Sequence, residues 1–322
     1  MAKRRGELVH GWVNLDKPAG MSSARAVATV RQVFNAAKAG HGGTLDPLAS
    51  GVLPIALGEA TKTVAYAMEG TKSYAFTVTW GAQTTTDDLE GDVVETSPLR
   101  PTQAAITAII PEFTGNILQT PPAFSAIKID GKRAYELARQ AVRSSGSVGP
   151  NKLADLSAMP KMESRPIYIE SLLLKALTGE GAVFRVTCGK GTYIRSLARD
   201  MARKLGTVGH VSMLRRLGVG PFTEESSISL DFLQNLEHSA AAFEHMHPVV
   251  SALDDIPAFP ISEDEAARFR HGQTLSITSA SAQARFASLQ PDVVAIALCG
   301  EQPVALVTAK ASELRPVRVF NL

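Results

Sequence analysis

The segment Ala39–Gly51, with the sequence AGHGGTLDPLASG, places one carboxylate, Asp46, directly before a proline on a glycine-rich stretch. Asp-Pro is a common helix start, with the aspartate as N-cap and the proline at the first helical position. One interpretation is therefore that Asp46 only caps a short helix that ends at Gly51. The spacing of the residues alone favours this interpretation.

The same segment also has features that suit a catalytic residue. Gly40, Gly42 and Gly43 allow unusual backbone angles and the close approach of a bulky ligand. Pro47 stiffens the chain on the other side of the carboxylate. A carboxylate held on a rigid loop with few side chains is a candidate covalent nucleophile. The two interpretations are compatible.

Length and composition describe an ordinary globular chain. Its 322 residues are 45% hydrophobic and 20% charged, enough for two domains or for one large domain with an appendage. No stretch approaches the roughly 20 apolar residues of a membrane span. The basic N-terminus lacks the apolar run of a signal peptide, so we expect a cytoplasmic protein with no membrane partner. Two isolated cysteines exclude a disulfide scaffold and a Cys-rich metal site.

The net charge of +2 hides a strong segregation of charge along the chain. Residues 183–220 carry eight basic residues and one acid, a net charge of +7, and residues 1–50 carry seven basic residues and three acids. Residues 221–265 carry ten acids and no Lys or Arg. One basic stretch is usually a solvated face, but two of them beside an acidic segment indicate a nucleic-acid partner.

Periodicity and turn residues predict the elements. The expected strands are 7–15, 73–80, 123–129, 167–176, 182–187, 293–298, 303–308 and 317–320. The expected helices are one capped by Ser22 or Ser23 and reaching Ala37, a helix over 102–113 that Pro111 interrupts, and helices over 132–142 and 193–205. Strands and helices alternate without a βαβ rhythm, so the predicted class is α+β, with a mixed, largely antiparallel central sheet flanked by helices.

A change in composition near residue 250 suggests two domains, 1–250 and a small, β-rich domain over 251–322. Residues 144–164 are rich in small polar residues and are expected to form a flexible loop within the first domain. Common cofactor and hydrolase motifs are absent, and Gly-Lys-Gly-Thr at 189–192 lacks the spacing of a P-loop. Glu244, His245 and His247 cluster without other ligand types nearby, and we interpret them as surface residues.

Extended to Lys62, the opening segment reads AGHGGTLDPLASGVLPIALGEATK. It resembles the catalytic segment of the bacterial tRNA pseudouridine synthases of the TruB family, AGHxGxLDPxAxGxLPxxxGxATK. Six further segments resemble family motifs in the same order: GWVNLDKPAGMSS (11–23), KSY (72–74), TTTDDLEG (84–91), PPAFSAIKIDGKRAYELA (121–138), GKGTYIR (189–195) and LRRL (214–217). The resemblance covers roughly residues 8–230, and the C-terminal tail resembles an RNA-binding domain of the PUA type.

The resemblance implies a pseudouridine synthase fold and one reaction. Uridine at position 55 in the T loop of tRNA would be isomerised to pseudouridine, the base leaving its N-glycosidic bond and rejoining the ribose through C5. This reaction is redox-neutral, so the resemblance implies that it needs no cofactor or metal. It also implies that the protein acts as a monomer.

Three catalytic residues carry over from the family motifs. Asp46 matches the essential nucleophile, and attack on C6 of the uracil, attack on C1′ of the ribose and assistance of proton removal at C2′ all remain open. Tyr74 matches the tyrosine that stacks on the target base, and a role in proton transfer is also plausible for its phenol. Arg195 matches the arginine that pairs with the aspartate, which favours the ionised carboxylate and fixes its orientation.

Five substrate-binding residues also carry over. Tyr193 and Leu214 match residues that line the uracil pocket, and Asp88 matches an aspartate in an active-site loop. Lys17 belongs to the Lys-Pro pair of the N-terminal motif. His41 matches the histidine that occupies the T loop when the target base is flipped out, a step that costs roughly a few kcal/mol.

A group of basic residues on the helix and strand of the +7 segment suits contacts to tRNA phosphates. The group is Arg199, Arg203, Lys204, Arg215 and Arg216. One departure from the family pattern is Thr85, which stands where the loop motif has an aspartate.

Two other function classes remain. An RNA-binding or tRNA-folding factor would use the same basic segments and the same tail, but it would not need Asp46, Tyr74 and Arg195 as a set. A carboxylate glycosidase would need a second carboxylate paired with Asp46. Asp16 and Glu59 are near in sequence but are better explained otherwise, so the synthase ranks first.

Overall fold

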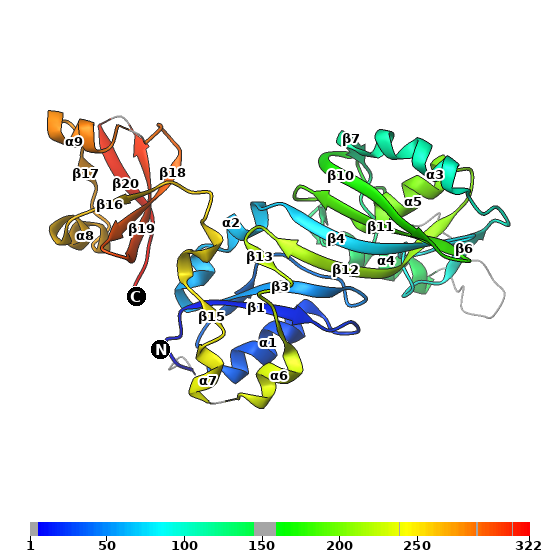
Figure 1. Cartoon of the computed structure of the whole chain (residues 1–322), viewed down its shortest axis with the longest axis horizontal. Helices are drawn as coiled ribbons and strands as arrows, with labels where there is room; N and C mark the ends of the chain where they lie inside the picture. Colours follow the sequence, from blue (N-terminus) through cyan, green and yellow to red (C-terminus); the bar gives the residue numbers. More distant parts are fainter. Residues whose placement is uncertain (1–5, 145–158, 238, 288, 311) are drawn as a thin grey trace.

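The computed structural model describes residues 6–144 and 159–322, except positions 238, 288 and 311. Most of the loop expected at 144–164 therefore lies outside the described residues. Figure 1 shows a large sheet flanked by helices and, beyond it, a small sheet formed by the C-terminal part of the chain. This is an α+β architecture, as the sequence predicted.

The large sheet has its strands in the order β14-β1-β3-β12-β4-β11-β10-β7, with β13, β15 and β2 paired at its side. These strands are β1 (Gly11–Lys17), β2 (Ala39–His41), β3 (Ser50–Leu57), β4 (Lys72–Trp80), β7 (Gly115–Gln119), β10 (Arg165–Leu177), β11 (Gly181–Cys188), β12 (Gly209–Val219), β13 (Phe222–Thr223), β14 (Ile228–Ser229) and β15 (Met246–His247). Only β1 with β14 and β12 with β3 pair in parallel. The sheet is thus mixed and largely antiparallel, as predicted.

Helices pack against one face of this sheet because the strands alternate. In β4 the side chains of Tyr74, Phe76, Val78 and Trp80 are buried and those between them are half-buried. They share one core with residues of α1 (Ser23–Val33), α3 (Gln103–Ile109) and α5 (Ile194–Lys204). The core therefore fixes α5, which carries Arg195, against the centre of the sheet.

Shorter elements complete the first part of the chain. They are α2 (Val64–Glu69), α4 (Ala134–Ser144), α6 (Leu230–Asn235) and α7 (Ala240–Phe243); the 3-10 helices η1 (Gly58–Lys62), η2 (Ile110–Phe113) and η3 (Val249–Ala252); and the small hairpins β5 (Ala82–Thr84) with β6 (Val93–Thr96) and β8 (Lys128–Ile129) with β9 (Lys132–Arg133). Of the described helices, none combines the length and the apolar composition needed to cross a membrane.

The small sheet has the order β16-β18-β19-β20-β17. Its elements are β16 (Ala258–Pro260), α8 (Glu263–Arg270), β17 (Leu275–Ser276), α9 (Ala280–Arg285), β18 (Val294–Cys299), β19 (Gln302–Lys310) and β20 (Glu313–Val319). A shared apolar cluster joins it to the large sheet, with Trp12, Val52 and Phe222 on one side and Ile296, Leu306 and Phe320 on the other. The small sheet is thus packed against the body of the protein.

Two hydrogen bonds accompany this cluster. The ammonium of Lys62 donates to the carbonyl of Val319 at 2.7 Å, and the backbone N–H of Asn321 donates to the carboxylate of Glu59 at 2.8 Å. Glu59 therefore has a structural role, which agrees with the expectation that it is not a second catalytic carboxylate.

Several expected elements differ from the structure. The strand expected at 123–129 exists only as Lys128–Ile129, because the preceding residues form an irregular segment. The first helix ends at Val33 and does not reach Ala37, since Asn35 has a positive φ of 45° that no helix accommodates. The helix that Asp46 was expected to cap is absent, and residues 42–49 form turns and irregular backbone. Asp46 is therefore not a helix cap.

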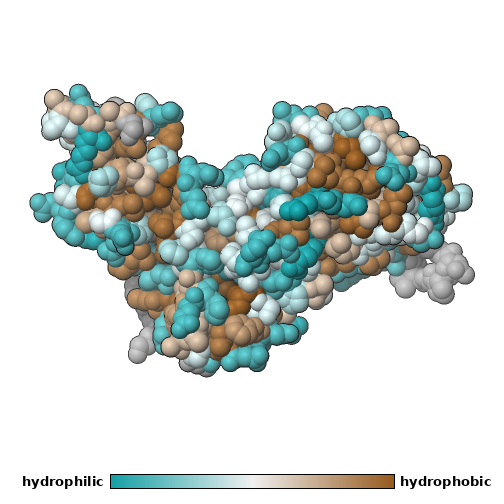
Figure 2. Space-filling view, in the orientation of Figure 1, coloured by the Kyte–Doolittle hydropathy of each residue, from teal (hydrophilic) through white to brown (hydrophobic). Residues whose placement is uncertain are grey.

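The face drawn in Figure 2 shows hydrophobic residues gathered over the small sheet and over the part of the large sheet that contains β10 and β11. Strand β10 contributes the exposed side chains of Tyr168, Leu173 and Leu177, and the adjacent β7 contributes Leu118.

Candidate active site

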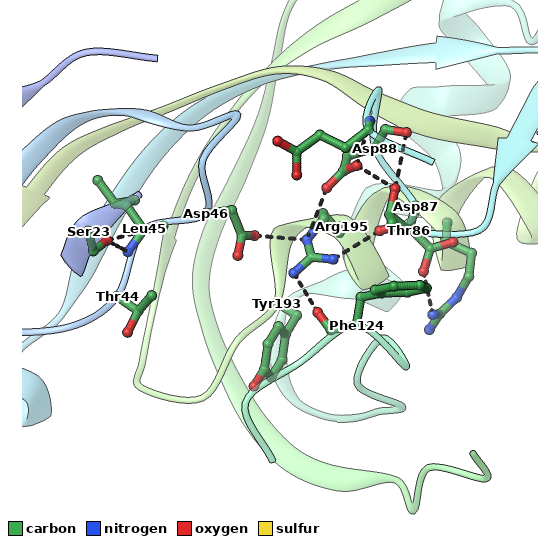
Figure 3. A network of polar contacts seen from close by, with 12 residues as sticks. Ser23, Thr44, Leu45, Asp46, Thr86, Asp87, Asp88, Phe124, Tyr193 and Arg195 are labelled. Carbon is green, nitrogen blue, oxygen red and sulfur yellow. Dashed lines mark hydrogen bonds and ion pairs between the residues drawn. The ribbon is translucent and has the colours of Figure 1, made fainter. Parts of the chain in front are cut away.

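Asp46 lies on the loop between β2 and β3, and distant residues hold this loop in place. The hydroxyl of Ser23 accepts a hydrogen bond from the N–H of Leu45 at 2.8 Å and donates one to the carbonyl of Leu45 at 2.7 Å. The residue directly before Asp46 is thus fixed on both of its backbone groups by the first residue of α1 (Figure 3). This tertiary contact replaces the helix that the local sequence favoured.

Glycine is required at two positions of the loop. Gly43 has a φ of +119°, which residues with side chains rarely adopt. Gly51 has a φ of +100°, and a Cβ atom there would lie 2.1 Å from the carbonyl oxygen of Arg216. Gly51 therefore lets the chain run close to β12, whereas Gly43 is favoured by its backbone angle.

Arg195, at the start of α5, binds Asp46. Its Nε donates to the Asp46 carboxylate at 2.8 Å, and its two terminal nitrogens donate to the carbonyls of Thr86 at 2.9 Å and Phe124 at 3.1 Å (Figure 3). The arginine side chain is 6% exposed, whereas that of Asp46 is 35% exposed. The geometry thus gives a carboxylate that is held from behind by a buried cation and remains open on one side.

Asp88 approaches the same nitrogen of the guanidinium as Asp46. Its carboxylate is 3.6 Å from Nε of Arg195 and accepts hydrogen bonds from the hydroxyl of Thr86 and from the N–H of Glu90. With 2% of its side chain exposed, Asp88 does not face solvent. Its contacts suit a residue that supports Arg195, not a second reactive carboxylate of the kind that a glycosidase needs.

Three of the predicted residues lie on β4, on β12 and directly before α5. Tyr74 on β4 is buried, and burial raises the pKa of its phenol, while Arg216 opposes the rise. Leu214 on β12 is buried and is the register partner of Phe76. Tyr193 precedes α5, and burial raises the pKa of its phenol as well.

His41 and Lys17 also belong to this region. The Nδ1 atom of His41 accepts a hydrogen bond from the N–H of Gly43 at 3.3 Å, and burial lowers the pKa of the imidazole. Lys17 is fully buried, and its ammonium donates to the carbonyls of Pro18 at 2.9 Å and Met21 at 2.7 Å, with Pro47 at 3.5 Å. These contacts hold the backbone beside Asp46, so any effect of Lys17 on a substrate is indirect.

The basic residues expected to contact phosphates are largely used inside the protein. Arg199 and Arg216 are buried, which contradicts the expectation for these two. Arg199 pairs with Asp87 and Asp200, each at 2.9 Å. The other three also have protein partners: Arg203 with Gln83, Lys204 with Glu112, and Arg215 with Asp16 and Glu224. Much of the positive charge of residues 183–220 therefore balances internal acids, which the linear sequence cannot reveal.

Two residues at the site were not predicted from the sequence. Arg216 contacts the loop that carries Asp46, and Gln119 holds the backbone of Tyr193 by accepting from its N–H at 2.8 Å and donating to its carbonyl at 3.1 Å. Arg216 belongs to the LRRL motif and was expected to contact tRNA phosphates, not the loop that carries Asp46. Gln119 lies just before the motif at 121–138, and no feature of the sequence marked it.

Two surface hollows lie along β15, one beside residues 225–229 and one beside residues 7–10. Neither includes Asp46, Tyr74 or Arg195. In the described part of the chain, no three His, Cys, Asp or Glu side chains are grouped so that they could hold a metal ion. The residues around Asp46 are therefore recognised as a site by the polar contacts that they share, and not by a surface hollow.

Comparison with protein families gives two matches in sequence. Residues 31–194 match the N-terminal domain of TruB family pseudouridylate synthase, and residues 195–256 match the C-terminal domain of tRNA pseudouridylate synthase B. The first match ends at α5 and contains Asp46, Tyr74 and Tyr193, whereas Arg195 opens the second.

Related proteins match over nearly the whole chain. The chain is 48% identical to tRNA pseudouridine synthase B of Rhodospirillum rubrum, over 99% of each chain. It is 45% identical to the protein of the same name from Caulobacter vibrioides, over 100% of each. Among solved structures, a Cbf5-Nop10-Gar1 complex contains a chain with 26% identity and a TM-score of 0.69, with 97% of this chain and 84% of that chain covered. The chain therefore belongs to the TruB family of pseudouridylate synthases.

Proposed function

We propose that this protein isomerises the uridine at position 55 in the T loop of tRNA to pseudouridine, with the base flipped out and Asp46 as the nucleophile. As a member of the TruB family it is a tRNA pseudouridine synthase, an isomerase. The position in the T loop, the flipping of the base and the role of Asp46 are the parts that we propose. The expected monomer and cytoplasmic location belong to the same proposal.

One observation carries the proposal: the ion pair between Asp46 and Arg195 is buried on the arginine side and open on the aspartate side. A nucleophilic carboxylate must be ionised, oriented and accessible, and this geometry supplies all three. The three routes left open by the sequence need the same free oxygen. In each route the bond from N1 to C1′ breaks, C5 bonds to C1′, and the proton of C5 is lost while N1 gains one.

The other residues take supporting roles in this proposal. Tyr74 stacks on the flipped uracil, and Tyr193 and Leu214 bound the space for the base. His41 is on the same loop as Asp46 and occupies the position that the base leaves in the T loop. Its Nδ1 is used by Gly43, so its Nε2 carries the proton and can donate to RNA.

For the small sheet we propose the RNA-binding role of a PUA-like domain over residues 251–322. The five-stranded sheet and its own apolar core support this assignment. Its packing against the body of the protein keeps it at a fixed place relative to Asp46.

An unmodified tRNA transcript tests the proposal. It is incubated with the protein without added cofactor, and pseudouridine is mapped by carbodiimide labelling and primer extension. We expect one stop at the T-loop uridine, and none in a transcript with cytidine at that position. Tight binding of tRNA without any product would instead favour an RNA-folding factor.

A further inference from the structure

Arg216 is a buried cation at the centre of the site. It lies on β12, which pairs with β3 on one side and β4 on the other, and it is 1% exposed. No carboxylate of a described residue forms an ion pair with it. Removing a charge from water is costly without a partner, so such a residue is retained for what its charge and its hydrogen bonds do.

The donors of Arg216 reach the loop that carries Asp46. The guanidinium donates from Nη2 to the carbonyl of Gly43 at 3.1 Å and from Nη1 to the carbonyl of Thr44 at 3.4 Å. Its Nε donates to the carbonyl of Val52 in β3 at 2.7 Å. The guanidinium of Arg216 thus binds the backbone at both ends of the loop that carries Asp46.

The same guanidinium reaches Tyr74. Arg216 and Tyr74 are register partners on neighbouring strands, so their side chains leave the sheet side by side. Arg216 opposes the rise that burial causes in the pKa of the Tyr74 phenol, so the guanidinium acts on this group. Arg216 also acts electrostatically on three other groups of the site, Asp46, His41 and Lys17.

The loop is shaped around this arginine. The missing side chain of Gly51 leaves room for the backbone of Arg216, and a Cβ on Gly43 would lie 3.6 Å from its Nη1 atom. Both glycines with positive φ between Ala39 and Gly51 therefore lie beside Arg216.

We propose that Arg216 is a positioning residue for the reaction: it holds the loop that carries Asp46 in place beside Tyr74, and its charge stabilises negative charge on the phenol oxygen. The inference rests on the proposed function for its kinetic part only. Arg216 touches no reacting atom, so its effect passes through Tyr74 and the loop.

Kinetics of Arg216→Gln and Arg216→Lys test the positioning. Glutamine keeps some hydrogen bonding without the charge, and lysine keeps the charge without the planar fork. We expect Arg216→Gln to lower kcat by about 100-fold while KM stays within roughly threefold, and Arg216→Lys to lose less. Arg100→Gln is the control, because Arg100 is an exposed arginine that pairs with Glu180 and takes no part in the proposed site. It should keep the wild-type kcat.

The charge effect is measured without RNA. With 3-fluorotyrosine at position 74, the phenol is titrated by fluorine NMR in each background. Loss of the cation in Arg216→Gln should raise the pKa of the phenol by about 1 unit, since an opposite charge within reach of a titratable group shifts its pKa by about that much or more. Arg216→Lys should leave the pKa near that of wild type.

A folded Arg216→Gln protein with wild-type kcat would overturn the positioning role, and an unchanged phenol pKa would overturn the charge effect. If Arg216→Gln does not fold, Arg216→Lys decides: lowered kcat with unchanged KM supports the inference, and wild-type kcat overturns it. If the wild type makes no pseudouridine, the proposed function fails, while the titration still tests the link between Arg216 and Tyr74.

Discussion

Arg195 joins three chain segments through one side chain. Its guanidinium contacts Asp46, Thr86 and Phe124, which are 149, 109 and 71 residues away in sequence. Arginine suits this task because its planar fork offers donors in fixed directions, which an ammonium cannot. The residue therefore sets the place of the carboxylate and the relation of two other loops to it.

Replacing Arg195 by lysine should separate the effect of its charge from the effect of its hydrogen-bond geometry. Lysine keeps the positive charge but cannot contact the carboxylate and both carbonyls together, so we expect kcat to fall by about 100-fold or more. Single-turnover kinetics with tRNA measure this. Arg199→Lys is the control, since Arg199 lies one turn further along α5 and binds Asp87 and Thr120 in the same manner. It should lose stability and retain kcat, and equal losses of kcat in both variants would contradict the role of Arg195.

Lys17 gives a prediction of pH dependence. Burial lowers its pKa to about 8 from the ordinary value of 10.5. Between these two values the unfolded chain binds more protons than the folded one, so the free energy of unfolding rises with pH across that window. Below pH 8 the cost of the buried charge is fully present.

The free energy of unfolding of Lys17→Met should therefore lack this rise with pH. Denaturant unfolding at pH 8 and pH 10 measures it, with the exposed Lys38→Met as a control that keeps the wild-type rise. A rise of the same size in Lys17→Met and in wild type would show that Lys17 is not its source.

At the scale of elements, the start of α1 and the catalytic loop form one unit. Ser22 caps the helix by accepting from the N–H of Arg25, and the adjacent Ser23 instead binds both backbone groups of Leu45. Two neighbouring serines thus have different tasks, one for the helix and one for the loop.

These serines form a matched pair of variants. Ser22→Ala should cost about 1 kcal/mol of stability through the lost cap and leave kcat unchanged. Ser23→Ala leaves the N–H and carbonyl of Leu45 without a partner beside Asp46, at a cost of about 1–3 kcal/mol for each group, and should also lower kcat. Thermal unfolding and single-turnover kinetics compare them. A loss of kcat in Ser22→Ala as large as in Ser23→Ala would contradict the distinction.

The elements also show what the sequence can predict. Strand β4 was predicted within one residue because its alternation of apolar and polar residues is a local property. The hairpin of β10 and β11 and the helix α5 were predicted for the same reason. The cap at Asp46 was wrong because the loop takes its shape from Ser23, Lys17 and Arg216, contacts that no local pattern contains.

Motif resemblance predicted some residues of the site and not others. Asp46, Tyr74 and Arg195 came from motif resemblance, and the structure brings Asp46 and Arg195 into contact. The phosphate-binding role assigned to Arg199 and Arg216 was wrong, because burial and pairing depend on the tertiary fold. Arg216 illustrates the difference: its type was visible in LRRL, but its partners lie more than 140 residues earlier in the chain.

At the scale of the whole molecule, the small C-terminal sheet is held by an apolar cluster that also contains Trp12 and Phe222. Phe320, just after the last strand, is 2% exposed within this cluster, and Leu322 two residues later is 44% exposed. The small sheet is thus packed against the body of the protein, and we expect the two sheets to unfold together.

Phe320→Ala should therefore uncouple the unfolding of the small sheet from that of the rest of the protein. Truncation of a buried phenylalanine costs about 3–5 kcal/mol, and here the cavity opens between the two sheets. We expect calorimetry to show the small sheet unfolding at a lower temperature than the rest, whereas Leu322→Ala keeps a single transition. Unchanged unfolding of Phe320→Ala would show that the cluster does not couple the two parts.

The central claim is that Asp46 is the nucleophile of a tRNA pseudouridine synthase. Its most direct test compares wild type with Asp46→Asn on unmodified tRNA, under single-turnover conditions and with tRNA binding measured in parallel. Asparagine has nearly the same shape but no charge, so it should bind tRNA with similar affinity and form no pseudouridine at the T-loop uridine. Pseudouridine formed by Asp46→Asn at the wild-type rate would contradict the claim and would leave the exposed carboxylate without a catalytic role.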